Sequence, residues 1–583
     1  MQVDTPMSMS LLRIAFSVVV PCVLASALFA QSVPVGSCEP GRASATLETN
    51  SVEVGLWNTG QLFYGTTGYG LYLVPKSSGT YPAENGNLWI SGVVEDSLRT
   101  TIKDSFFGDY WPGPLADADA PPVDCEAHDR MWTVSRDDVL HYYATGEASP
   151  DLAEWPAHLG APVLDGDGIV GNYDLAAGDQ PDLVGDAAVW WVMNDAGNEH
   201  GYAYRPGTAP LGLEIRVHAF AFEGSPFLTV PSTPLQEATF YRYRFVNRRD
   251  VPLDSVYVSL YAFGRTGAAG NDFLGTDSLR HVAYIYNAYP GAIDRYGDRP
   301  ASWGIQVLRG PVGLGNDRDD DYDGDTDESG ERLRLSSSPP AFFLDSLGEY
   351  PRSPREWVNV QRGLFPNGDQ IYGYGHGVHC FQGCQYCLPG CEIGKPTVFA
   401  FPADPSAGEF WSEMNSTGQG HRNGPYYREV VVSTGPFRIE PGESAEILYA
   451  MPFARTNHHL ESVTALRTIA GGLLAAFGDG VPSRRVEGPP APPLPTSRSL
   501  APVRPNPGAG GQVALLALPE AAYVDAVVID ALGRRVAVVA SGTLAAGERA
   551  LAIPDGLPPG AYVLRVAVER GQPVSLPFTV VGR

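Results

Sequence analysis

Apolar and polar residues alternate along much of this chain, and a period of two predicts β-strands. In 240–246, for example, aromatic and aliphatic residues alternate with Arg242 and Arg244, as in a strand with one buried face. Similar runs, rich in β-branched and aromatic residues and bounded by Gly, Pro or Asp, recur up to Met451. They cover 56–65, 70–74, 87–92, 188–193, 213–222, 240–247, 255–262, 281–287, 397–401, 428–433 and 445–451. We therefore predict a mostly-β fold with a multidomain, β-sandwich-like body and long loops.

One segment has a helical period instead. Apolar residues three and four positions apart predict a helix over about 458–477, with Asn457 suited to the N-cap and Gly478 to the stop. These apolar positions are Leu460, Val463, Leu466, Ile469 and Leu473. Segments without either period are predicted to be loops, namely 117–186, 310–345 and 363–395.

The C-terminal stretch consists of short apolar runs separated by Gly-, Pro- and Asp-containing turns. This pattern predicts a small Ig-like β-sandwich. The runs are 513–518, 524–529, 535–539, 550–553, 562–568 and 575–581. A Pro-rich segment at 488–495 precedes it and predicts a stiff, extended linker.

The N-terminus has the features of a targeting segment. Arg13 precedes an apolar run over 14–30, which predicts a cleaved secretory signal peptide; a membrane anchor is the alternative. The expected organisation is a signal peptide (1–30), a β-rich N-terminal body (31–310), a second β-rich part with an acidic loop, a Cys-rich loop and the helix (311–485), a linker (486–510) and a C-terminal module (511–583).

The charge balance narrows the class of partner. The chain carries 40 basic and 66 acidic residues, a net charge of −26. Such a chain repels nucleic acid and anionic lipid and attracts divalent cations, so we expect no nucleic-acid partner.

Motifs in the C-terminal module carry a family resemblance. They join a Pro-Asn-Pro start, an Asp-Ala-Leu-Gly-Arg turn and a Gly-Ala-Tyr strand. The residues concerned are Pro505, Asn506, Pro507, Asp530, Gly533, Arg534, Gly560 and Tyr562. In this order they resemble the type A C-terminal sorting domain of cargo of the type IX secretion system in Bacteroidetes-like bacteria.

That resemblance implies where the protein is transported rather than what activity it has. It implies export through the inner membrane, recognition of the module by the type IX secretion machinery, removal of the module, and release or attachment to surface lipopolysaccharide. The body is similar to uncharacterised secreted proteins that carry the same tail. Read physically, Gly533 and Gly560 suit turns that need positive φ, and Tyr562 suits a core position.

A tract of alternating carboxylates is the strongest candidate metal site. In 317–328 the alternating carboxylates are followed by Gly324, as in the first half of an EF-hand-like loop. The candidate ligands are Asp319, Asp321, Asp323, Asp325, Asp327 and Glu328. We expect structural Ca²⁺ here, with a solvated acidic loop as the alternative.

A second candidate calcium loop lies at 165–175. Asp165 and Asp167 precede Gly168, and Asp174 would close the loop, with Val170 packing inward. Val163 stands where a first ligand would be expected. Three further acidic residues are either additional ligands or turn residues, namely Asp179, Asp182 and Asp186.

The cysteines are predicted to form disulfides. Leaving out Cys22 of the targeting segment, an even number remains in an exported chain. They are Cys38, Cys125, Cys380, Cys384, Cys387 and Cys391. One economical arrangement joins Cys38 to Cys125 and forms two bridges within the Cys-rich loop. With His376 and His379 nearby, a Zn²⁺ site in that loop is the alternative.

The sequence contains no Gly-x-Ser-x-Gly, His-Glu-x-x-His or phosphate-loop signature. We therefore expect a secreted or surface-attached protein of binding or structural type. The alternative is a glycosidase-like hydrolase with a carboxylate pair in one of the acidic regions. Three tryptophans, expected to be exposed, would then stack on sugars: Trp111, Trp132 and Trp155.

Overall fold

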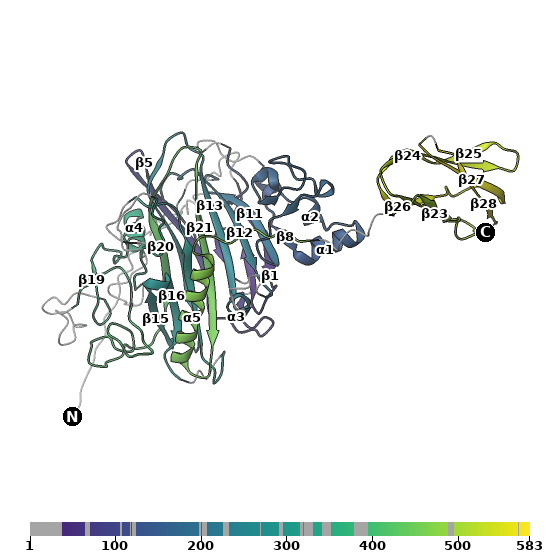
Figure 1. The fold of residues 1–583 in the computed structure, drawn as a ribbon. Coiled ribbons are helices and arrows are strands. Elements are labelled where there is room, and N and C mark those ends of the chain that lie inside the picture. The colour runs from purple at the N-terminus through teal and green to yellow at the C-terminus, as the bar shows by residue number, and fades with distance from the viewer. Residues whose placement is uncertain are drawn as a thin grey trace, which may run out of the picture.

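The computed structural model describes residues 38–583, apart from 65–69, 105–107, 117, 119–123, 198–199, 201–206, 225–231, 269, 291–294, 315–318, 320–329, 341–350, 378–393, 488–494, 570 and 583. The described chain consists mainly of antiparallel strands, which confirms the predicted mostly-β fold (Figure 1).

Two large sheets form the body. The first sheet runs in the order β1-β2-β3-β5-β14-β20, with β4 paired to β2 and β6 to β5. Its strands are β1 (Ser44–Leu47), β2 (Glu53–Trp57), β3 (Gln61–Leu62), β4 (Tyr72–Leu73), β5 (Ala83–Val94), β6 (Ser97–Ile102), β14 (Leu253–Gly264) and β20 (Glu429–Ile439).

The second sheet runs in the order β15-β16-β17-β21-β13-β12-β11-β7, with β8 paired to β11. Its strands are β7 (Trp111–Pro112), β8 (Trp132–Ser135), β11 (Ala187–Asn194), β12 (Leu213–Ala221), β13 (Ala238–Asn247), β15 (Asp272–Asp277), β16 (Val282–Asn287), β17 (Ala301–Arg309) and β21 (Ser444–Arg455).

Side chains from both sheets share one buried core. Phe63, from the first sheet's side, meets Trp303 of β17 edge to face with ring centroids 5.9 Å apart. Strand β13 shows how the alternation works: Tyr241 and Tyr243 point into this core, while Arg242 lies on the opposite face. The half-buried strand predicted from the pattern is confirmed.

Helices cover the outer faces of both sheets. Helix α5 (His459–Phe477) packs Phe477 against Phe240 on the second sheet, with ring centroids 5.6 Å apart. Helix α4 (Pro354–Gln361) packs Trp357 against Trp89 on the first sheet, at 4.6 Å. The body is therefore a sandwich with an extra helical layer on each outer face.

Helix α5 confirms the helical prediction, but its cap differs. The N-cap is His458, whose Nδ1 accepts a hydrogen bond from the Leu460 N–H at 3.3 Å, rather than Asn457. The predicted loop 117–186 also contains short helices that the pattern did not reveal. The remaining helices are α1 (Arg136–Thr145), α2 (Pro150–Ala153) and α3 (Ser232–Gln236), with short 3₁₀ turns η1 (Cys125–His128), η2 (Ala157–Leu159), η3 (Leu175–Ala177) and η4 (Ser278–Arg280).

The expected boundary at residue 310 does not separate two sheets. Strand β20 pairs with β14, and β21 lies between β13 and β17, so 31–310 and 311–485 contribute to the same sandwich. The strand predicted at 397–401 is mostly absent, because only β19 (Pro396–Thr397) forms there, paired with β18 (Ile371–Tyr372). Strands β15 and β17 were not predicted.

The C-terminal module has its own two sheets and its own core (yellow in Figure 1). One has the order β22-β23-β26 and the other β25-β24-β27-β28. The strands are β22 (Ser499–Leu500), β23 (Val513–Leu518), β24 (Ala522–Asp530), β25 (Arg535–Leu544), β26 (Gly547–Ala552), β27 (Gly560–Val568) and β28 (Val574–Val580). The predicted small sandwich is confirmed.

The motif residues of the module occupy turn and core positions. Asp530 accepts hydrogen bonds from the N–H groups of Leu532 and Arg534, both at 2.9 Å, and closes the turn in which Gly533 has φ +80. Tyr562 is buried against Phe578 and donates to the Pro558 carbonyl at 2.7 Å. Asn506 accepts from the Thr579 N–H at 2.9 Å.

One motif glycine has a different role from the one expected. Gly560 begins β27 and does not adopt a positive φ, whereas Gly533 does. Gly560 is part of a strand and pairs with Val580, so the turn requirement applies to Gly533 alone.

Candidate functional site

The best-defined cluster of carboxylates lies in the loop between β9 (Val163–Leu164) and β10 (Gln180–Pro181). These two short strands pair antiparallel and bring the ends of the loop together. Asp165, Asp167 and Asp179 each place one carboxylate oxygen within 4.8 Å of the other two. Asp165 and Asp167 are exposed, whereas Asp179 is buried.

Local hydrogen bonds give the loop its shape. Asp165 Oδ1 accepts from the N–H groups of Asp167 at 3.0 Å and Gly168 at 2.6 Å. Asp167 Oδ1 accepts from the Ile169 N–H at 2.8 Å, and its Oδ2 accepts from Asn172 Nδ2 at 2.8 Å. Asp side chains that bond to the backbone two residues on are typical of such turns, and Gly168 has φ +83.

Asp179 closes the loop from its other end. Its carboxylate accepts from the N–H groups of Gly166 at 2.8 Å and Asp174 at 2.7 Å. These backbone hydrogen bonds hold the pKa of Asp179 below its usual value, because they stabilise the charged form. The three clustered carboxylates can therefore share a cation.

Two sequence-based expectations for this loop need correction. Asp174 is not part of the cluster: its Oδ1 accepts from the N–H groups of Ala176 and Ala177, and so caps η3. Val170 does not pack inward, because 94% of its surface is exposed. The loop therefore differs from the calcium-loop arrangement expected from its spacing.

Two neighbouring carboxylates have structural partners instead. Asp182 accepts from the Val184 N–H at 3.3 Å and from the Ser483 hydroxyl, and Asp186 accepts from the Glu223 N–H at 2.9 Å. They behave as turn residues rather than as part of the cluster.

The segment that ends the body is anchored to this loop. Arg485 donates to the carbonyls of Gly178 at 2.7 Å, Leu164 at 3.0 Å and Asp165 at 2.7 Å. Val486 exchanges two hydrogen bonds with the Gln180 side chain. These contacts fix the position of Asp165 and Asp179 from outside the loop.

Calcium takes six to eight oxygen ligands, so the three carboxylates would supply only part of a shell. Backbone carbonyls and water would have to supply the rest. Such partial shells are typical of weak extracellular sites.

The other predicted ligands fall largely outside the described residues. Of the acidic tract only Asp319 is described, so the remaining tract ligands Asp321, Asp323, Asp325, Asp327 and Glu328 lie outside them. The same holds for the signal peptide and for Cys380, Cys384, Cys387 and Cys391.

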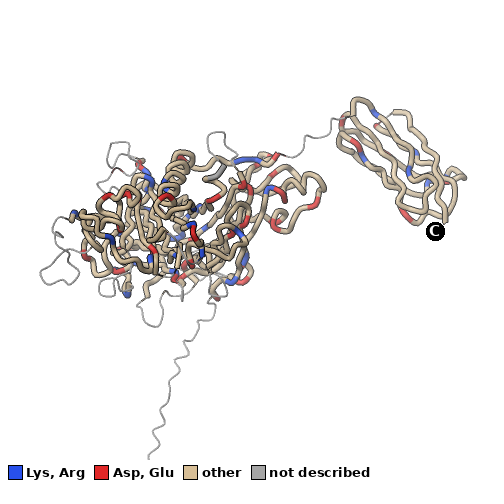
Figure 2. Tube along the Cα trace, turned by 90° about the horizontal axis from the view of Figure 1, so that it is seen from below, with Lys and Arg blue, Asp and Glu red and all other residues tan. Residues whose placement is uncertain are grey.

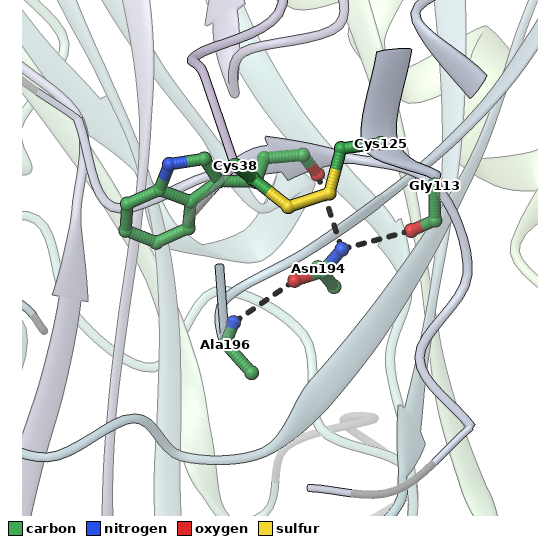
Figure 3. Close-up of a disulfide and its surroundings, with 6 residues drawn as sticks. Cys38, Gly113, Cys125, Asn194 and Ala196 are labelled. Carbon is green, nitrogen blue, oxygen red and sulfur yellow. Dashed lines mark hydrogen bonds between the residues drawn. A yellow bond between two sulfur atoms is a disulfide. The ribbon is translucent and has the colours of Figure 1, made fainter. Parts of the chain in front are cut away.

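Cys38 and Cys125 form the expected disulfide, with Cα atoms 5.8 Å apart (Figure 3). Both cysteines are buried against Trp111. Asn194 donates to the carbonyls of Trp111 at 3.4 Å and Gly113 at 3.1 Å, which places β7 beside β11. The disulfide thus fastens the start of the described chain to the edge of the second sheet.

The tryptophans expected to stack on sugars are not exposed. Trp111, Trp132 and Trp155 are 4%, 6% and 2% exposed. Trp155, for example, donates its Nε1 hydrogen to the Pro162 carbonyl at 2.9 Å. These side chains stabilise the fold, and the sugar-stacking expectation is wrong for them.

Buried carboxylates elsewhere in the body also have structural roles. Asp195 accepts from the N–H groups of Leu211, Gly212 and Leu213 at 2.6–2.9 Å. Glu413 forms a bidentate ion pair with Arg428, at 2.8 and 2.7 Å. Sequence reasoning did not identify either group, because their partners are remote or lie in irregular segments.

No family model matches the chain, and no curated protein matches it. Among solved structures, it is similar to a polysaccharide lyase, with TM-score 0.22 and 9% identity over 94% of this chain and 46% of that one. It is also similar to the glycoside hydrolase domain of Endo-D from Streptococcus pneumoniae, with TM-score 0.11 and 7% identity over 58% of this chain and 33% of that one. The chain spans less than half the length of either protein.

Proposed function

We propose that this chain is an exported protein of binding or structural type whose C-terminal module directs it across the outer membrane through the type IX secretion system. The observation that carries the proposal is the position of the motif residues. Asp530, Gly533 and Tyr562 hold the turns and core of a separate two-sheet module. These three residues stabilise the shape of the module, which the secretion machinery would recognise. None of the three lies at a reactive centre, so a sorting role suits the module better than a catalytic one.

The body suits delivery as a stable folded unit. Its sheets are covered on both outer faces, and a disulfide joins Cys38 to Cys125. Disulfides persist in oxidising compartments, which supports export. The tryptophans proposed for sugar binding are buried, which favours a binding or structural role over the hydrolase alternative.

Calcium is proposed as a structural ligand of the body. Asp165, Asp167 and Asp179 support this, since their carboxylates gather within 4.8 Å at the surface of a net-negative protein. Extracellular calcium concentrations make even a weak site sufficient.

Deletion of residues 505–583 tests the export proposal. In a bacterium that has the type IX machinery, we expect the truncated body to accumulate in the periplasm, while the full chain reaches the surface or the medium. Quantitative immunoblots of the cell fractions measure this distribution.

A matched control keeps the module intact. Leu515 is 46% exposed on β23 and lies outside the motif residues, so Leu515→Ala leaves the core untouched and should not alter the distribution. Equal surface display of the truncated and full-length proteins would refute the sorting role.

A further inference from the structure

A pocket of 320 Å³ lies on the outer face of the second sheet, beyond the C-terminal end of α5. Its walls come from three neighbouring strands and from the chain that leaves the helix. The lining residues are Arg242, Arg309, Glu446, Leu448, Asp479, Gly480, Val481 and Pro482. The volume is that of a site for a small molecule rather than for a polymer.

Strand pairing brings two arginines to this pocket. Leu448 of β21 is the cross-strand partner of Arg242 on β13 and of Arg309 on β17. The register of β17 and β21 shifts between Val307 and Arg309, and such irregularities re-aim a side chain. Both guanidinium groups therefore flank the buried Leu448.

Each of these two arginines has one buried polar hydrogen that no protein atom accepts. The Nε atoms of Arg242 and Arg309 are both buried and have no hydrogen-bond partner. Arg242 approaches Glu446 only to 3.8 Å, which is too far for a hydrogen bond. In the part of the chain that the structure describes, neither Arg309 nor Asp479 makes an ion pair within 4 Å. A buried N–H without an acceptor destabilises a protein, so two at one pocket indicate a missing acceptor.

Positive charge is in excess around the pocket. Burial, and then the nearby charge of Arg309, lower the pKa of Arg332, whose Nη1 donates to the Gly310 carbonyl at 3.1 Å. The guanidinium groups of Arg242 and Arg309 line the pocket with the carboxylates of Glu446 and Asp479, and Arg332 adds a third positive charge near Arg309 and Glu446. Basic and acidic residues are otherwise interspersed over the molecule (Figure 2), whose net charge is −26.

We infer that this pocket binds a small oxyanion, a carboxylate or a tetrahedral sulfate or phosphate group, through Arg242 and Arg309. A guanidinium presents N–H groups in a planar fork that matches such oxygens, and charge-assisted hydrogen bonds are among the strongest in proteins. The ligand supplies the acceptors that Nε of each arginine lacks and neutralises the excess charge. Val481 and Pro482, which lead toward the linker, form the wall that the ligand contacts.

Titration of the full-length protein with sodium sulfate, phosphate or acetate tests this inference. Calorimetry at constant ionic strength, balanced with sodium chloride, should show saturable binding. Binding of sulfate and phosphate without acetate identifies a tetrahedral group as the ligand, and binding of acetate identifies a carboxylate. Absence of saturable binding by all three anions overturns the inference.

Substitutions locate the binding. Arg309→Gln removes charge-assisted hydrogen bonds to the ligand, so the affinity should fall roughly tenfold to a hundredfold. Arg309→Lys keeps the positive charge but lacks the planar fork of guanidinium N–H groups. It should therefore weaken binding while preserving the fold. Circular dichroism verifies folding of each variant.

Arg244 provides the matched control. It lies two residues from Arg242 on the same face of β13, but it is exposed and donates to the Ser444 hydroxyl at 2.9 Å. Arg244→Gln should leave the affinity unchanged. Equal binding by wild type, Arg309→Gln and Arg309→Lys would place the anion elsewhere and overturn the assignment.

Discussion

The body and the C-terminal module are both antiparallel sandwiches, but only the body covers the outer faces of its sheets. In the body, α5 and α4 bury those faces with Phe477 and Trp357. In the module, large apolar side chains remain exposed on the strands, including Tyr523 at 52% and Val538 at 48%. In the body, buried contacts therefore lie between the two sheets and also under the helix on each outer face. The module has only the core between its two sheets.

The difference extends to buried charge. The body encloses Glu413 and Arg428, whose side chains are 0% and 2% exposed, whereas the module's ion pair between Asp530 and Arg534 lies at a turn, with Arg534 70% exposed. A large, covered sandwich can surround a charged pair with hydrogen bonds, and a small one cannot. We expect the two parts to unfold independently, which suits the proposed removal of the module after transport.

The largest expected effect comes from breaking the buried ion pair. Arg428→Met leaves Glu413 buried without its bidentate partner and should lower the free energy of unfolding of the body by about 3–5 kcal/mol. All ten tryptophans precede residue 488, so denaturation followed by tryptophan fluorescence reports on the body alone.

The matched control is an exposed arginine on β20. Arg438 pairs with Asp254 and Glu440 at the surface, so Arg438→Met should lower the free energy of unfolding far less than Arg428→Met. Equal losses for the two variants would show that burial is not what distinguishes these pairs.

A core substitution probes the module in the same way. Leu564 is fully buried, and Leu564→Ala should destabilise the module by about 2–5 kcal/mol. Hydrogen exchange of β24 and β27 should become faster, while the tryptophan transition of the body stays unchanged. Leu515→Ala, at a side chain 46% exposed, is the control and should change exchange little. Simultaneous destabilisation of the body would contradict independent unfolding.

The stability of the body should also depend on pH through Asp272. Burial raises the pKa of Asp272 to about 6, although hydrogen bonds from Thr266 and the charges of Arg428 and Arg265 oppose the rise. Between about pH 4 and pH 6 the folded protein keeps a proton that the unfolded chain releases, so this group's contribution to stability falls as pH rises, by up to about 3 kcal/mol.

Asp272→Asn isolates that contribution. The amide oxygen can still accept from Thr266, but it does not titrate. Urea denaturation gives the free energy of unfolding at each pH. In the wild type Asp272 makes this free energy decrease between pH 4 and pH 6, and we expect the variant to lack that decrease. Identical pH profiles for the variant and the wild type would show that Asp272 titrates normally in the folded protein.

Calcium removal should have the smallest effect. For a weak extracellular site, about 5 mM calcium should stabilise the body by about 1–2 kcal/mol, and chelation should lower its melting temperature accordingly. Asp167→Asn should abolish the response. Glu147→Gln, at an exposed position outside the cluster, should keep it. A calcium response retained by Asp167→Asn would move the site to other residues.

Strand periodicity predicted most of the body's strands and the module's sandwich, because a period of two directly reports a buried face. It did not reveal α1, whose apolar residues are few and whose start depends on a capping box between Ser135 and Asp138. It also missed β15 and β17. These strands are short or contain polar residues, and contacts with the rest of the fold bury them although their sequence pattern does not show it.

The candidate sites depend on contacts that the sequence does not encode locally. Spacing predicted Asp174 as the closing ligand, whereas pairing of β9 with β10 brings Asp179 to the cluster instead. The oxyanion pocket joins Arg242 and Arg309 across β21, and only the strand order places them together. The alternation around Arg242 predicted a side chain that faces solvent. In the structure the walls of the pocket leave this side chain half-buried.

The central claim is that the C-terminal module is a sorting signal that also directs an unrelated protein across the outer membrane. Its most direct test joins residues 495–583 to an unrelated periplasmic protein with its own signal peptide, in a bacterium with the type IX machinery. Surface labelling and fractionation then measure where the fusion accumulates. The account predicts that the fusion appears on the surface or in the medium, whereas the same protein without 505–583 stays in the periplasm. A folded fusion that remains in the periplasm would contradict it.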